Sequence, residues 1–226
     1  MAEDCQKKST QKHQTTVFVL DFDDTLLPYT SLYSEGIGLH DREIWESCKG
    51  SQSILSKEKE TWYTEKWDVL EQQLISSLKI FLELSPLVHI VTAGEENWVD
   101  FSCAKFYPNL WCFIRKHNIK IYSARTLYEK QYPDNYVEWK SAVIRSILRE
   151  YNTDPATCQI VSIGDSYVER NATIKVADEM NYQRKSIKMI EKPNLDRMLV
   201  QWKLLSYMIP KLYTHEGNLD LMMVVQ

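Results

Sequence analysis

Two stretches of the sequence deliver acidic side chains directly after apolar runs. Residues 17–27 read VFVLDFDDTLL, so that four apolar residues lead straight to Asp21 and Asp23, and residues 160–166, IVSIGDS, end another apolar run at Asp165. If the extended backbone continues, Asp21 and Asp23 project to the same side, because side chains alternate along a strand. Adjacent anions repel, and a hard divalent cation with oxygen ligands relieves that repulsion. The spacing therefore predicts metal-assisted chemistry, with ordinary turn residues as the alternative.

Three more polar residues stand where they could take part. Thr92 follows the apolar run 87–91 and is followed by Ala93-Gly94, so its hydroxyl could hold an anionic oxygen or simply cap a helix. Lys140 comes about one turn into a predicted helix, where the helix dipole disfavours a cation unless an anion is near. A surface lysine lying along an apolar face is the alternative. Glu169 follows Asp165 by four residues, on the next helical turn.

The pattern of apolar residues predicts an open α/β sheet. Short apolar runs without polar alternation are typical of parallel strands buried on both faces. Such runs, the last of them weaker, occupy residues 17–20, 87–91, 119–122, 160–163 and 186–190. Helical patterns lie between most of them, one of which begins after the predicted N-cap Asn135, and a C-terminal segment from Leu195 to Leu212 is also helical in pattern until Pro210 disturbs it. This alternation indicates a Rossmann-like fold with helices on both sides of the sheet.

The predicted domain organisation is one core with a small insertion. We expect a flexible tail at 1–16, a core domain at 17–215 and a C-terminal tail at 216–226. About sixty residues separate the first two strands, which is too long for a simple crossover. A helical stripe at 67–81 accounts for part of this connection. The polar remainder, 28–60, is expected to form a flap and a small helical cap.

Composition excludes several classes of partner. The chain has 226 residues, 44% of them hydrophobic, and a net charge of −4, so it lacks the positive field that favours nucleic acid or anionic membranes. No apolar stretch is long enough to cross a bilayer, and a cytoplasmic protein is expected. The five cysteines have no zinc-site spacing and are interpreted as reduced packing thiols. The five histidines are isolated, and His89 lies inside a predicted strand.

Taken in order, these segments resemble the four motifs of the haloacid-dehalogenase-like superfamily. The motifs are D-x-D-x-T at residues 21–25, the strand-terminal Thr92, Lys140, and G-D-x-x-x-E at residues 164–169. The stretches DFDDTLLPYTSL, IVTAGEENWV, IKIYSARTLYE and SIGDSYVERNA are similar to a eukaryotic subgroup with no assigned substrate. The chain has Ala93 where that group is expected to carry asparagine, and a glutamate where the fourth motif usually has aspartate.

The resemblance implies a mechanism with a covalent intermediate. Asp21 would attack a phosphoryl group and become an aspartyl-phosphate. Asp23 would act as general acid to the leaving alcohol and then as general base for water. Lys140 would neutralise the nucleophile and the transferring oxygens, and Thr92 would hold the phosphoryl group. An acid at the second position favours phosphate ester hydrolysis over dehalogenation.

The resemblance also implies Mg²⁺ as the cofactor. Asp21, the backbone carbonyl of Asp23 and Asp165 would hold the ion, and Glu169 would support its water ligands. The predicted activity is hydrolysis of a phosphate monoester, on a phosphorylated small molecule or a phosphoprotein. A catalytically silent protein that keeps the fold to bind a partner is the main alternative. A phosphomutase would need a larger cap than 28–60 provides.

Overall fold

The computed structural model describes residues 15–34 and 57–224, and these form an α/β fold around one open sheet. The six strands are all parallel and lie in the order β3-β2-β1-β4-β5-β6. Their bounds are β1 (Thr15–Leu20), β2 (Val88–Thr92), β3 (Lys120–Ser123), β4 (Cys158–Gly164), β5 (Gln183–Lys188) and β6 (Leu219–Met222). The predicted fold class, a Rossmann-like open parallel sheet, is confirmed.

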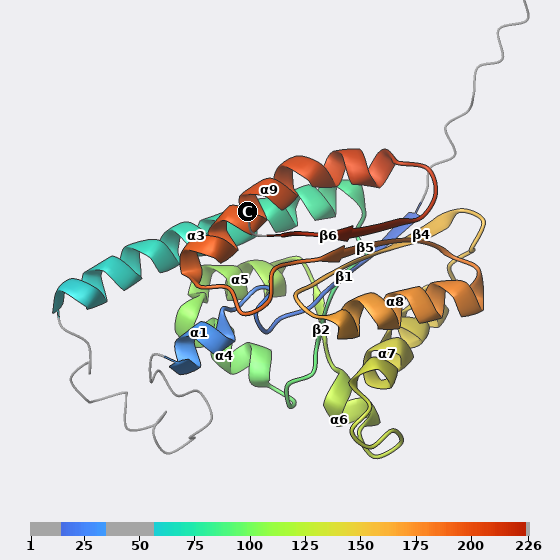
Figure 1. The fold of residues 1–226 in the computed structure, drawn as a ribbon, viewed down its shortest axis with the longest axis horizontal. Coiled ribbons are helices and arrows are strands. Elements are labelled where there is room, and N and C mark those ends of the chain that lie inside the picture. Colours follow the sequence, from blue (N-terminus) through green and yellow to red (C-terminus); the bar gives the residue numbers. More distant parts are fainter. Residues whose placement is uncertain (1–14, 35–56, 225–226) are drawn as a thin grey trace, which may run out of the picture.

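Helices cover both faces of this sheet (Figure 1). They are α1 (Tyr29–Ser34), α3 (Lys57–Leu84), α4 (Trp98–Phe106), α5 (Pro108–Lys116), α6 (Ala124–Tyr128), α7 (Tyr136–Glu150), α8 (Tyr167–Met180) and α9 (Leu195–Thr214). One core joins α3, α4, α5 and α9 to the face that carries Phe18 and Leu20, and a second joins α7 and α8 to the face that carries Val17 and Val19. Burial on both faces explains why β1 shows no polar alternation. No helix within the described ranges has both the length and the apolar character that a bilayer crossing requires.

The strand order sets where a ligand can bind. β1 lies between β2 and β4, and the chain builds outward from β1 in one direction and from β4 in the other. This change of direction is a topological switch point, and in open α/β sheets the binding crevice lies outside the carboxyl ends of the strands there. Asp21 directly follows β1 and Asp165 directly follows β4. The two acids predicted to act together therefore leave the sheet side by side.

The structure corrects the predicted boundaries at both ends. β1 begins at Thr15, so the last two residues of the predicted 1–16 tail belong to the sheet. The segment 216–226, predicted as a tail, contains strand β6, which pairs with β5. Its alternating Leu-Asp-Leu-Met pattern is that of an edge strand, which a four-residue run signals only weakly. Within 28–60, α1 and the start of α3 are helical, and residues 35–56 of the predicted cap lie outside the described ranges.

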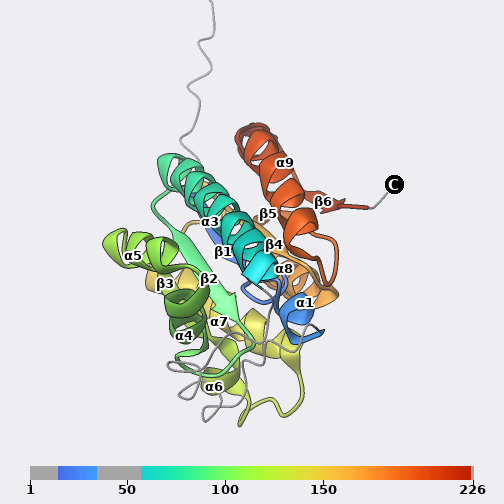
Figure 2. The same cartoon turned by 90° about the vertical axis from the view of Figure 1, so that its left-hand side faces the viewer.

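Helix α9 lies beside α3 over the centre of the sheet, as Figure 2 shows along with Figure 1. The β1–β2 and β5–β6 connections both cross the face that α3 and α9 cover, but they run toward opposite edges of the sheet. Two such connections have opposite handedness, so one of them is left-handed, against the usual preference. Pro210 lies inside α9, which continues to Thr214. The position of α9 brings the fully buried Trp202 to the loop after β1, where its indole N–H donates to the Thr25 carbonyl at 2.7 Å.

His89 in β2 is a buried polar residue that the core accommodates poorly. Its side chain is 2% exposed, and neither ring nitrogen has a hydrogen-bond partner among the described residues. The ring packs near Tyr122 and Tyr151, with centroid separations of 5.9 and 5.4 Å. Burial, assisted by the charge of Lys120, lowers the pKa of His89 from 6.5 to about 4. The folded protein therefore holds this imidazole neutral.

We expect His89 to make folding stability fall in mild acid. Below about pH 6.5 the unfolded chain binds a proton at this position that the folded chain refuses until about pH 4, so stability is lost as the pH falls through that window. Over the whole window the free energy of unfolding falls by roughly 3 kcal/mol. Urea unfolding at pH 7.5 and pH 5 should show a smaller acid loss for His89→Phe, which keeps the ring contacts. The exposed His117→Phe is the control, and an equal acid loss in His89→Phe and wild type would contradict this reading.

Candidate functional site

The loop after β1 curls tightly so that its acids face the carboxyl edge of the sheet. The Asp21 N–H donates to the Ile163 carbonyl at 2.9 Å, which extends the β1–β4 pairing by one residue. The Phe22 carbonyl accepts from the N–H groups of Leu26 at 2.8 Å and Leu27 at 2.9 Å, which closes a short turn. Asp24 has a positive φ of 53°, a conformation tolerated by aspartate in turns. The extended backbone assumed from the sequence thus ends within this turn.

Buried donors from outside the loop hold it in place. Trp202 donates to the Thr25 carbonyl, and the Tyr107 hydroxyl donates to the Leu26 carbonyl at 2.9 Å. Phe22 and Leu26 are themselves fully buried. Because these backbone carbonyls would otherwise be unpaired in the core, the two donors determine the path of the loop. The acids are therefore carried on a rigid support.

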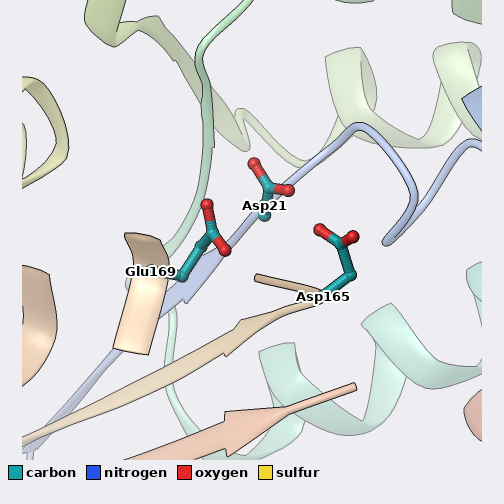
Figure 3. Close-up of side chains that lie close together, drawn as sticks. All are labelled: Asp21, Asp165 and Glu169. Atoms are coloured by element: carbon teal, nitrogen blue, oxygen red, sulfur yellow. The ribbon is translucent and has the colours of Figure 1, made fainter. Parts of the chain in front are cut away.

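Three carboxylates converge at the switch point (Figure 3). Asp21 follows β1, Asp165 follows β4, and Glu169 lies in the first turn of α8. One carboxylate oxygen from each residue lies within 4.8 Å of the other two. Asp21 and Glu169 are buried and Asp165 is partly buried. The predicted convergence of the acid at position 21 with the one at position 165 is therefore observed.

Lys140 of α7 reaches this acidic cluster from the opposite face of the sheet to α3. Lys140 is 3% exposed, and its ammonium donates to Asp21 Oδ1 and to Glu169 Oε1 in two buried ion pairs. The Asn135 side chain caps α7 by accepting from the Glu138 N–H at 3.1 Å, as predicted. Lys140 is thus a buried partner of two acids and not the snorkelling surface lysine that the sequence also allowed.

Three carboxylates share one ammonium in the cluster, and their pKa values are shifted in different directions. Burial is the largest influence on Asp21 and raises its pKa well above the usual value, with Lys140 in opposition. Burial and the charge of Glu169 raise the pKa of Asp165 to about 7. For Glu169 burial acts upward, but contact with Lys140 outweighs it and lowers the pKa. For Lys140 burial acts downward, but Asp21 and Glu169 together raise its pKa.

This charge deficit and the donor chemistry fit a cation. The described residues provide no ion pair for Asp165, although it lies in the same cluster as the other two acids. Carboxylate oxygens at such spacing are the ligands that hard divalent cations prefer. An added positive charge would also offset the burial that raises the pKa of Asp21 and Asp165. The acidic cluster could therefore hold a metal ion.

Asp23 belongs to a second, neighbouring group. Its Oδ2 accepts from the Thr92 hydroxyl at 3.0 Å, and its Oδ1 accepts from the Trp98 indole N–H at 2.7 Å. Burial raises the pKa of Asp23, and these two hydrogen bonds oppose the shift. The Asp23 carboxylate is not part of the acidic cluster, so a ligand role for this residue would fall to its backbone carbonyl. The Thr92 hydroxyl, predicted to hold an anionic oxygen of a substrate, donates here to an aspartate.

Two glycines allow the site side chains to pass close to the backbone. A Cβ at Gly164 would collide with the Glu169 side chain, and one at Gly94 would collide with the Trp98 ring. Glu169 is further held by a capping box, in which its Oε2 accepts from the Ser166 N–H at 3.1 Å and from the Ser166 hydroxyl at 2.6 Å. Glu169 therefore caps α8 with one oxygen and meets Lys140 with the other.

Sequence reasoning missed some contributors. Trp98 gave no signal, because the contact to Asp23 depends on the loop between β2 and α4. The Thr25 hydroxyl, 3.3 Å from Asp21 Oδ2, was included in the first motif without a role. Ser166 could have been found, since Ser-x-x-Glu before an apolar helix is the capping-box pattern.

Comparison with models of protein families, with curated proteins and with solved structures finds no match to this chain. Its function is therefore inferred from the fold and from the geometry of the acidic cluster and of the group around Asp23.

Proposed function

We propose that this protein is a metal-dependent phosphatase that hydrolyses a phosphate monoester through a phosphorylated Asp21. The observation that carries the proposal is the separation of two acids two residues apart into different environments. Asp21 contacts a buried ammonium inside a cluster suited to a cation, whereas Asp23 accepts two hydrogen bonds outside it. Acids with such different partners can take different roles in one reaction.

In the first step Asp21 acts as the nucleophile. Its Oδ1 is held by Lys140, and Oδ2, which accepts only a long hydrogen bond from Thr25 among the described contacts, attacks phosphorus. A bond forms between Oδ2 and phosphorus while the bond from phosphorus to the alcohol oxygen breaks. Asp23 gives its proton to that departing oxygen. The raised pKa of Asp23 supports this role, because a proton must be present on the acid before the step.

In the second step water releases phosphate. Asp23, now a carboxylate, accepts a proton from water, and the water oxygen forms a bond to phosphorus as the bond to Asp21 breaks. Both acids return to their starting states. Lys140 stays in contact with Asp21 and Glu169 and balances the negative charge of the phosphorylated side chain.

The proposed cofactor is Mg²⁺, held by Asp21 and Asp165 with Glu169 close enough to contribute. When bound, a divalent cation neutralises phosphoryl oxygens and so lets an anionic nucleophile approach an anionic ester. The three carboxylate oxygens of the acidic cluster support this assignment, because Mg²⁺ prefers oxygen ligands. Phosphorylated small molecules and phosphoproteins are both candidate substrates.

The nucleophile prediction is tested with Asp21→Asn. Hydrolysis of 4-nitrophenyl phosphate with Mg²⁺ should fall by at least about a thousandfold, because the amide cannot form the intermediate. Chelation should abolish wild-type activity and added Mg²⁺ should restore it. The control is Asp178→Asn, an acid on the exposed face of α8 that pairs with Arg184. Wild-type turnover no greater than that of Asp21→Asn on a broad panel of phosphate esters would favour the silent binding protein instead.

The general-acid prediction is tested by varying the leaving group. Asp23→Asn should lower kcat/KM for methyl phosphate by about a hundredfold, since an alkoxide needs a proton to leave. For 4-nitrophenyl phosphate the loss in kcat/KM should be much smaller, because nitrophenolate leaves unprotonated. Trp98→Phe removes one hydrogen bond to Asp23. It should also lower kcat/KM more for methyl phosphate than for 4-nitrophenyl phosphate, but by less than Asp23→Asn does. Equal losses on both substrates would rule out proton donation by Asp23.

A further inference from the structure

A second feature of the carboxyl edge is a cavity of about 410 Å³ beyond the ends of β2 and β3. It lies between the loop that begins α4, the helix α5 and the start of α6. Its lining includes Thr92 at the end of β2, Ser123 at the end of β3, and the two tryptophans Trp98 and Trp111. A volume of this size holds a small organic group and is typical of the lower range of ligand sites.

The cavity adjoins the proposed general acid. Thr92 and Trp98 both line it, and these are the two residues that donate hydrogen bonds to Asp23. Along the sheet edge the order is β3, β2, β1, β4, so the cavity lies on one side of Asp21 and Asp165 on the other. In the proposed reaction the leaving oxygen faces Asp23. The rest of the leaving alcohol would then extend over β2 and β3 into the cavity.

The walls favour an aromatic group. Trp98 and Trp111 supply ring surface, and Val99 and Ile121 supply aliphatic surface. Trp98 is held through its indole N–H, so its ring orientation is determined before any ligand arrives. Rings that are already oriented bind a flat apolar group with little loss of side-chain freedom.

The charges of the lining disfavour an anion. Glu95, Glu96 and Asp100 line the cavity, against the single cation Arg115 among the lining residues, whose guanidinium lies 5.3 Å from the centroid of the Trp111 ring. Arg125, close enough to Glu95 to feel its charge, is ion-paired with Glu129. A negatively charged leaving group would therefore meet excess carboxylate, whereas a neutral or cationic one would not.

We propose that this cavity binds the leaving group of the substrate and selects monophosphate esters of an aromatic alcohol that carries no negative charge. The inference rests on the proposed phosphatase function and narrows it. It excludes esters whose alcohol part bears a second phosphate or a carboxylate. It also assigns Trp111 and Asp100 as specificity-determining residues that do not contact the reacting atoms.

The test uses three aryl phosphates whose ring carries a CH2 group bearing an ammonium, a hydrogen or a carboxylate: 4-(aminomethyl)phenyl, 4-methylphenyl and 4-(carboxymethyl)phenyl phosphate. The methylene keeps the acidity of the three leaving phenols similar. Wild-type kcat/KM should be about tenfold lower for the carboxymethyl ester than for the other two. Asp100→Asn should narrow that difference by reducing the repulsion.

Trp111→Leu separates binding in the cavity from chemistry. It should lower kcat/KM for the methylphenyl and aminomethylphenyl esters by about tenfold. Methyl phosphate, which is too small to reach Trp111, should be hydrolysed as before. Tyr207→Leu, which replaces an exposed aromatic residue on α9, is the matched control and should leave kcat/KM unchanged for the aryl esters and for methyl phosphate. Urea unfolding of each variant verifies that it is folded.

The outcomes separate the two proposals. If hydrolysis depends on Asp21 but the three aryl esters react alike and Trp111→Leu behaves as Tyr207→Leu does, the cavity does not bind the leaving group and the phosphatase function stands. If no ester is hydrolysed in an Asp21-dependent way, the phosphatase function fails and the leaving-group site fails with it. Charge selectivity together with the Trp111 effect supports both.

Discussion

The buried ammonium of Lys140 between Asp21 and Glu169 is the contact on which the arrangement of the site depends. It joins three segments of the chain: the end of β1, the N-terminal part of α7 and the start of α8. Removing one member of a buried ion pair leaves an uncompensated charge, which costs several kcal/mol, on the order of 3–5. The cluster is thus tolerated only as a set, and Asp165 remains the acid to which the described residues supply no ion pair.

The surrounding strands, loop and helix cap hold these side chains in place. β1 and β4 are adjacent at the switch point, so residues that follow them must emerge together. Trp202 and Tyr107 determine the path of the loop that carries Asp21, and the capping box orients Glu169. A site whose side chains are supported in this way holds its geometry without a ligand. The same rigidity extends to Asp23, whose two donors also form a wall of the neighbouring cavity.

Parts of this structure could be predicted from local pattern, and others could not. Apolar runs predicted the strands β1 to β5 within a few residues, because full burial on both faces leaves a plain signal. The short edge strand β6 was mistaken for a tail, since four residues with alternating polarity resemble a loop. Trp98 was missed because its hydrogen bond to Asp23 spans 75 residues and depends on how one loop turns. The sequence placed His89 inside a strand, but that its ring nitrogens have no hydrogen-bond partner among the described residues follows only from its surroundings.

By itself the sequence determined the α/β alternation and the delivery of acids to the ends of two buried strands, because periodicity and strand termini are local properties of the chain. Only the tertiary structure decided that Asp21, Asp165 and Glu169 share one space, that Lys140 lies inside it, and that Asp23 faces Trp98. The physical reason is that charge balance and hydrogen bonding at a buried site depend on distances between segments far apart in sequence. Those distances are set by strand order and by which face each helix covers.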